Sequence, residues 1–273
     1  SVNLSNVHFD PALPYWQDIL PFLNQLSGQG FPDFDRLSAL LPKGLQSHGR
    51  HRIRFTDSRQ LGDGGYEHRI YTTGQVSTRP DNWHDLFNSL IWMSFPRIKT
   101  AMNSLHFDAG AEMKSGSRGP VRDALTLFDE CGVIVFSNNL EILDALAGRR
   151  WSEAFLDKDF TASVGIVVVG HAMLEKYLAP YKAMTAKALL LHTSTEFMQR
   201  SREEQLGFID REVAQKMLDQ QMLTEPASLS PLPLAGVPGW WLKAEQESDG
   251  FYDDLQVFRP PPESMRRVPV ISI

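Results

Sequence analysis

Histidine and acidic side chains in several parts of the chain are suited to holding a catalytic metal ion. His84 and Asp85 stand at the start of one predicted helix, and His106 stands at the end of the next. Imidazole nitrogens and carboxylate oxygens are ligands that zinc, manganese and iron accept in proteins. Such an ion lowers the pKa of a bound water and generates hydroxide near neutral pH. The candidate metal ligands are His84, Asp85, His106 and His171.

Two further carboxylates are candidate catalytic groups. Glu175 follows His171 by four residues on a predicted helix, so both side chains share one helix face. Glu175 could act as a general base, or it could hold an imidazole in one tautomer. Asp123 could act as a catalytic carboxylate or as an additional ligand. The cofactor that these groups would hold is a divalent metal such as zinc or manganese.

The spacing of these residues matches no short catalytic motif. HExxH, paired CxxC, GxSxG, the P-loop and GxGxxG are all absent from the sequence. Asp85 in a first helical turn is also favourable against the helix dipole, whatever its function. The residue types therefore favour a metal-dependent hydrolase as a class. Metal-free acid/base catalysis by His171 and Glu175 stays open as an alternative.

A second alternative is a non-catalytic module that binds a small molecule or a protein. Guanidinium groups form paired hydrogen bonds with phosphate and carboxylate groups. Residues 50–73 alternate in polarity around a glycine-rich turn, which predicts a hairpin with an arginine-rich face. The segment PGWW at 238–241 could line an aromatic pocket. The candidate ligand-binding residues are Arg52, Arg79, Arg122 and Trp240.

The stretch 78–106 contributes most of the candidate metal ligands. Asp81 or Asn82 can cap a helix that begins at Trp83, and Pro96 can start a second helix that ends near His106. Further along, residues 124–129 and 133–137 are predicted as two short strands.

A β-α-β unit is predicted over residues 164–191. The run VGIVVV at 164–169 is typical of a strand buried on both faces, and KALLL at 187–191 is a second strand. If the two strands pair in parallel, His171 and His192 lie at the same rim of the sheet. A long amphipathic helix is expected over 195–223, with loop or extended segments after it.

Bulk properties indicate a single globular domain over residues 1–273. The chain carries a formal net charge of -6, which disfavours nucleic acid as a partner. The single cysteine, Cys131, excludes an intrachain disulfide and fits a cytoplasmic location. No apolar run reaches the roughly 20 residues of a membrane helix. We expect a mixed α+β fold: a helical lead-in at 1–45, a small sheet with one parallel β-α-β unit and helices packed around it, and a surface tail at 260–273.

Four blocks of the sequence resemble an uncharacterised proteobacterial family that is defined only as a domain of unknown function. The blocks are RPDNWHDLFN, RDALTLFDE, GHAMLEKYLAPY and PLPLAGVPGWW, and the similarity runs from about residue 50 to Pro260. The resemblance implies a cytosolic bacterial protein that forms one domain. It implies no activity, cofactor or catalytic residue.

Overall fold

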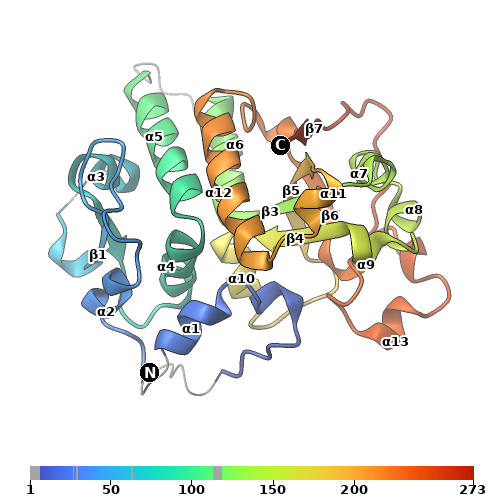
Figure 1. Ribbon diagram of the computed structural model, residues 1–273, viewed down its shortest axis with the longest axis horizontal. Helices are drawn as coiled ribbons and strands as arrows, with labels where there is room; N and C mark the ends of the chain where they lie inside the picture. Colours follow the sequence, from blue (N-terminus) through green and yellow to red (C-terminus); the bar gives the residue numbers. More distant parts are fainter. Residues whose placement is uncertain (1–6, 27, 29, 63, 113–118) are drawn as a thin grey trace.

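A mixed β-sheet forms the centre of the molecule (Figure 1). The computed structural model describes residues 7–273 except 27, 29, 63 and 113–118, and five strands of these residues pair in this sheet. The strands are β3 (Gly132–Ser137), β4 (Val164–Val168), β5 (Thr185–His192), β6 (Ser230–Pro233) and β7 (Val270–Ser272). β3 lies between β4 and β5, and all six of its residues are buried. The predicted α+β class, with a parallel strand pair, is confirmed.

β5 pairs in parallel with β3 and not with β4, so the predicted pairing of residues 164–169 with 187–191 is wrong. β4 runs antiparallel to β3, whereas β5 runs parallel to it. The C-terminal end of β4 therefore lies beside the start of β3, and that of β5 lies beside its end. His171 and His192 consequently lie at opposite ends of the sheet. β3, whose residues are all buried, lies between the two strands that were predicted to pair. The strand order that places it there cannot be read from the sequence pattern.

Helices pack around this sheet and separate it from a second, two-stranded sheet (Figure 1). The helices are α1 (Leu20–Leu26), α2 (Phe34–Ala39), α3 (Tyr66–Thr73), α4 (Trp83–Ser94), α5 (Pro96–Glu112), α6 (Pro120–Cys131), α7 (Leu140–Ala147), α8 (Trp151–Phe155), α9 (Phe160–Ser163), α10 (His171–Lys176), α11 (Thr195–Met198), α12 (Arg202–Leu218) and α13 (Lys243–Gln246). In the part of the chain that is described, no helix combines the length and apolar character needed to cross a bilayer.

The two central helices begin where the sequence predicts. The Asn82 side chain accepts a hydrogen bond from the Asp85 amide at 3.0 Å and caps α4 at Trp83. Pro96 is the first residue of α5. This helix continues past His106 to Glu112. Since proline has no amide hydrogen to donate, it ends one helix and is tolerated at the start of the next.

Two segments predicted as strands are helices. Residues 66–73 form α3, so the predicted hairpin is wrong, and β1 (Arg54–Asp57) instead pairs in parallel with β2 (Gln75–Thr78). Residues 120–131 form α6, which replaces the strand predicted at 124–129. The buried residues Leu125 and Phe128 are three apart, a helical spacing, and Pro120 occupies the first turn. In segments this short, the same apolar residues fit both the two-residue period of a strand and the 3.6-residue period of a helix.

The C-terminal third also differs from the prediction. The expected helix at 195–223 is divided into α11 and α12, because Ser201 and Glu204 form a capping box that starts α12. The loop that precedes PGWW contains β6, and residues 251–253 form a 3-10 helix. The end of the tail is not only a surface segment, since β7 pairs in parallel with β5.

We expect Gly74→Ala to lower the free energy of unfolding by about 2 kcal/mol or more. Gly74 ends α3 with a φ of 71°, and a Cβ there would lie 2.0 Å from the Arg52 carbonyl oxygen. Gly44 is a matched control, because its φ is 78° but a Cβ would have nothing within 4 Å. Urea denaturation should show a clearly smaller loss for Gly44→Ala. Equal losses would contradict a steric role for the Arg52 backbone.

Candidate functional site

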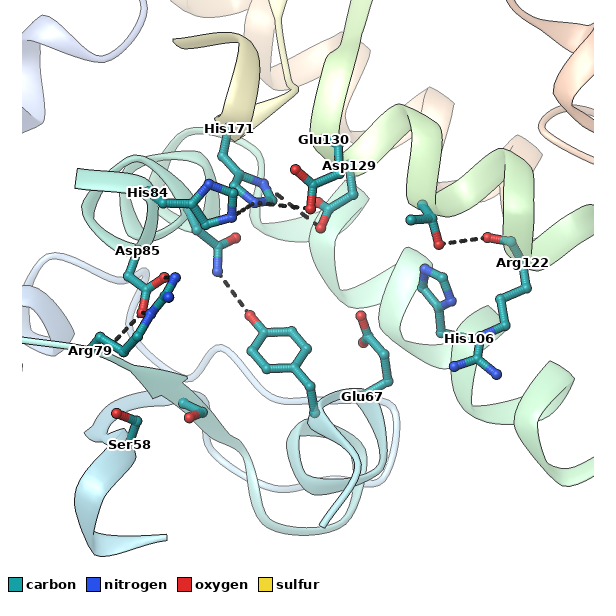
Figure 2. Close-up of a pocket in the computed structure, with 14 residues that line it drawn as sticks. Ser58, Glu67, Arg79, His84, Asp85, His106, Arg122, Asp129, Glu130 and His171 are labelled. Atoms are coloured by element: carbon teal, nitrogen blue, oxygen red, sulfur yellow. Dashed lines mark hydrogen bonds and ion pairs between the residues drawn. The ribbon is translucent and has the colours of Figure 1, made fainter. Parts of the chain in front are cut away.

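A cavity of about 540 Å³ lies between the α3–β2 region and helices α4, α5 and α6 (Figure 2). Its wall is rich in charged and imidazole side chains. They are Glu67, Arg79, His84, Asp85, His106, Arg122, Asp129, Glu130 and His171. Figure 2 shows His84, His171, Asp129 and Glu130 gathered at one side, and His106 with Arg122 at the other.

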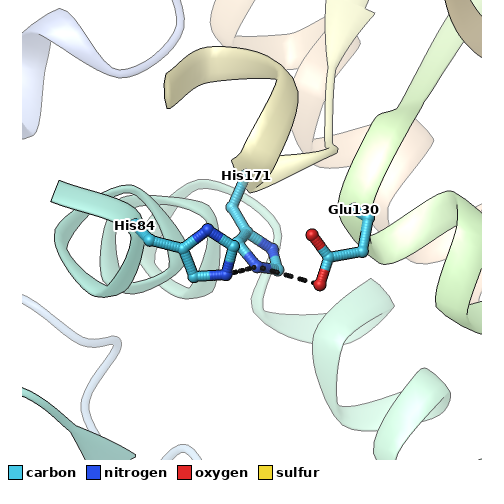
Figure 3. A group of neighbouring side chains, drawn as sticks. All are labelled: His84, Glu130 and His171. Carbon is cyan, nitrogen blue, oxygen red and sulfur yellow. Dashed lines mark hydrogen bonds and ion pairs between the residues drawn. The ribbon is translucent and has the colours of Figure 1, made fainter. Parts of the chain in front are cut away.

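His84, Glu130 and His171 converge on one point, and we call them the His/Glu group (Figure 3). One ligand atom from each lies within 4.8 Å of the others. The Nε2 atoms of His84 and His171 are 3.0 Å apart, and the His171 Nε2 lies 3.8 Å from the Glu130 Oε1. Two imidazoles and a carboxylate are a set of ligands that zinc accepts in proteins. This arrangement is compatible with a metal site.

Three helix ends bring the His/Glu group together. His84 lies in the first turn of α4, Glu130 in the last turn of α6, and His171 is the first residue of α10. Gly170 allows the last two to approach, since a Cβ there would lie 2.6 Å from the Glu130 carbonyl oxygen and 2.5 Å from the Gly132 amide nitrogen. The Gly170 amide in turn donates to the Gly132 carbonyl at 2.8 Å. Close packing at the start of β3 therefore sets the position of two of the three residues.

Carboxylates lie behind both imidazoles. The Nδ1 of His84 lies 2.9 Å from the Glu175 Oε2, and the Nδ1 of His171 lies 3.8 Å from the Asp129 Oδ2. A carboxylate can only accept, so the proton of the first contact is on His84 Nδ1. The second nitrogen of His84, Nε2, faces the His171 Nε2, and the donor of that contact depends on the tautomers of the two rings. Carboxylates in this position orient metal-bound imidazoles and raise their basicity.

A buried lysine holds Asp129 in place. The Lys99 Nζ donates to the Asp129 Oδ1 at 2.5 Å and to the Asn88 Oδ1 at 2.9 Å. The amide of Asn88 donates to the Tyr66 hydroxyl at 2.8 Å. The lysine side chain is only 4% exposed. A continuous hydrogen-bonded chain thus connects the cavity wall to the carboxylate that faces His171.

The electrostatic surroundings keep His171 neutral. Burial lowers the pKa of His171 to about 4; Asp129 opposes this shift, and Lys99 and His84 add to it. Burial would by itself raise the pKa of Asp129, but Lys99 and His171 lower it below its usual value. Burial raises the pKa of Glu130. A neutral imidazole is the form that binds a metal, so His171 is ready to act as a ligand at neutral pH.

Three of the predicted site residues lie together, and three do not join them. His84 lies between the other two and contacts both His171 and Glu175. Asp85 instead accepts two hydrogen bonds from the Arg79 guanidinium, at 2.7 and 3.0 Å. The other two residues are separate from the His/Glu group. They are His106, which is buried on the opposite wall, and Asp123, which lies in the first turn of α6 outside the cavity lining.

The predicted ligand-binding residues are similarly divided. Arg79 and Arg122 line the cavity. Arg52 is exposed beside β1, where the predicted hairpin does not exist. Trp240 is buried with its ring centroid 5.9 Å from that of Tyr15. The surface that a binding module would have built from Arg52 and Trp240 is therefore absent in its predicted form.

Sequence reasoning missed the third member of the His/Glu group and its support. The strands predicted at 124–129 and 133–137 place Asp129 and Glu130 at the end of a strand and in the turn after it. The helical spacing of Leu125 and Phe128 was the available signal that these acids end a helix. Lys99 carried no signal, because only the packing of α5 against α6 shows that it is buried.

Comparisons with known proteins identify a family but no characterised relative. A search of curated proteins and a search of solved structures each found no match. The family model described as "Protein of unknown function (DUF3025)" matches residues 53–262. This match covers more than half of the chain and agrees with the resemblance seen in the four sequence blocks. The chain belongs to the DUF3025 family of proteins of unknown function.

Proposed function

We propose that the protein is a metal-dependent hydrolase that holds a divalent cation with His84, Glu130 and His171. The observation that carries this proposal is the convergence of two imidazole nitrogens and a carboxylate oxygen within 4.8 Å, on the wall of a cavity large enough for a small substrate.

The spacing of the three side chains suits a tetrahedral ion after a small adjustment. Zinc–ligand bonds of about 2.1 Å at tetrahedral angles place neighbouring ligand atoms about 3.4 Å apart. The His84–His171 and His171–Glu130 separations of 3.0 Å and 3.8 Å lie on either side of that value, and the His84–Glu130 separation is within 4.8 Å. For both Nε2 atoms to bind the ion, His171 must carry its proton on Nδ1. That nitrogen is buried without a hydrogen-bond partner among the described residues and faces Asp129.

The cavity has the charge that such an ion would need. Its lining contains the carboxylates of Glu67, Asp85, Asp129 and Glu130, but only two guanidinium groups, those of Arg79 and Arg122. Lys99 lies behind this wall and binds Asp129, which leaves an excess of one negative charge that a divalent cation would offset. Three protein ligands leave a fourth position for water, which is typical of catalytic rather than structural zinc sites. The bound ion would lower the pKa of that water and polarise the bond to be cleaved.

The roles of the acidic residues follow from their contacts. Glu175 already accepts from His84, so we assign it the orientation of that imidazole and not the removal of a proton from water. Arg79 is held by Asp85 at the cavity edge, with 56% of its side chain exposed, and could bind an anionic part of the substrate.

Metal analysis followed by activity assays tests the proposal. Protein purified without chelator or affinity nickel should contain close to one equivalent of zinc or manganese. It should hydrolyse at least one member of a panel of phosphoesters, esters and amides. Dialysis against chelator should abolish that activity, and the same metal should restore it. Absence of bound metal, combined with no change in melting temperature on adding zinc or manganese, would overturn the proposal.

A further inference from the structure

A second pocket, of about 720 Å³, is separate from the cavity that contains the His/Glu group. It is formed by the start of β5, by β6, by α8 and by the segments around residues 149, 226 and 256–259 (the right half of Figure 1). Its lining contains four cationic side chains and no acidic one. We call it the basic pocket, and its cations are Arg149, Lys176, Lys187 and Arg259. This concentration is unexpected in a chain with a net charge of -6.

The four cations have no ion-pair partner among the described residues. The acids that lie within two residues of the lining in sequence are paired elsewhere, Glu175 with His84 and Glu153 with Arg150. Asp254 binds Lys182 at 2.9 Å, and Glu225 binds Arg266 at 2.7 Å. Like charges that share a pocket repel one another unless an anion joins them. The pocket therefore has positive charge that nothing in the described chain neutralises.

The backbone at Arg149 is unfavourable for an arginine. The Arg149 amide donates to the Leu146 carbonyl at 3.1 Å, and the Arg150 amide donates to the Ala145 carbonyl at 2.8 Å. These two bonds form a Schellman motif at the end of α7, in which Arg149 has a φ of 54°. Glycine is the favoured residue at this position, because a Cβ is strained in the left-handed region. A strained residue at a pocket wall is a reason to look for function.

The side chain of Arg149 is also incompletely bonded. Its Nε atom is buried and has no hydrogen-bond partner within the described part of the chain. A buried guanidinium nitrogen without an acceptor is costly, so the position of this side chain against the pocket wall is unfavourable as well as its backbone. Tyr181 adds a ring at the rim of the same pocket; it is 51% exposed and makes no ring contact in the described part of the chain.

We propose that the basic pocket binds a ligand with several phosphate groups and an aromatic ring, such as a nucleoside triphosphate. Four cations exceed what a single carboxylate would need, and guanidinium and ammonium groups both bind phosphate. The volume fits a ligand of this size. The exposed ring of Tyr181 is placed to stack on a base. This inference does not depend on the proposed hydrolase activity, because the two sites share no lining residue.

Calorimetric titration of the full chain with ATP, tripolyphosphate and adenosine tests the proposal. EDTA should be present throughout, so that binding through the His/Glu group and a metal is excluded. We expect ATP to bind, tripolyphosphate to bind more weakly, and adenosine not to bind. Tyr181→Ala should remove the advantage of ATP over tripolyphosphate.

Arg149→Gly separates binding from folding. The substitution removes the guanidinium and relieves the backbone, so the melting temperature should be unchanged or higher while ATP affinity falls roughly tenfold or more. Gln220→Gly is the matched control, because Gln220 ends α12 in the same motif with a φ of 55° and lies outside the pocket. It should leave ATP affinity unchanged. Lack of ATP and tripolyphosphate binding at millimolar concentration, or binding that Arg149→Gly and Lys187→Ala both leave intact, would overturn the proposal.

Discussion

Replacement of either histidine of the His/Glu group by alanine is expected to weaken zinc binding by more than about 100-fold. Removing an orienting carboxylate from a metal site typically costs 10- to 100-fold, and loss of a direct ligand should exceed that. His84→Ala is the better first variant, because the His84 side chain is 30% exposed, whereas His171 is buried and its removal leaves a cavity. Affinity is measured by competition with a zinc chelator.

Glu175 and His48 provide graded controls for this experiment. Glu175→Gln keeps the shape of the side chain but weakens the acceptor of the His84 Nδ1 proton, so we expect a loss of about 10- to 100-fold. His48 is exposed and lies outside the cavity lining, so His48→Ala should bind zinc like the wild type. If His84→Ala retained wild-type affinity while remaining folded, the ion would have to be held elsewhere.

The parts of the site that could be predicted depend on local signals. Asn82 caps the start of α4 and Pro96 starts α5, and both act only on the residues next to them. The start of α4, and hence the position of His84 in its first turn, therefore followed from sequence. The proximity of His171 and Glu175 followed from helical periodicity. Helix caps and helical spacing depend on residues that are close in sequence, so they can be recognised from one sequence alone.

The parts that could not be predicted depend on strand order and burial. His171 was expected to lie beside His192, but β3 separates β4 from β5 and directs His171 toward α4 instead. Glu130 became a neighbour of His171 because residues 120–131 form a helix that ends at β3. Both outcomes are set by long-range packing. The place of an apolar segment in the sheet depends on the strands and helices that pack against it, and not on its own sequence of polar and apolar residues.

Lys99→Met is expected to lower the free energy of unfolding by about 3–5 kcal/mol. The substitution preserves much of the side-chain volume but leaves the half-buried Asp129 without its cation, and it removes the donor to Asn88. Uncompensated buried charge is among the most destabilising changes in a protein. Urea denaturation at pH 7 measures the loss. The exposed Lys243–Glu247 pair is the control, and Lys243→Met should change stability by less than about 1 kcal/mol.

A double variant distinguishes the loss of a favourable pair from the creation of an unpaired charge. If the unpaired Asp129 carboxylate is what makes Lys99→Met costly, then Lys99→Met combined with Asp129→Leu should recover a large part of the lost stability, because neither charge remains. The same double variant should bind zinc less tightly than the wild type, since His171 then lacks the carboxylate that faces its Nδ1. Recovered stability with weakened binding would mean that the Lys99–Asp129 pair is kept in the core to orient a ligand. A double variant as unstable as Lys99→Met, with unchanged zinc affinity, would make the pair purely structural.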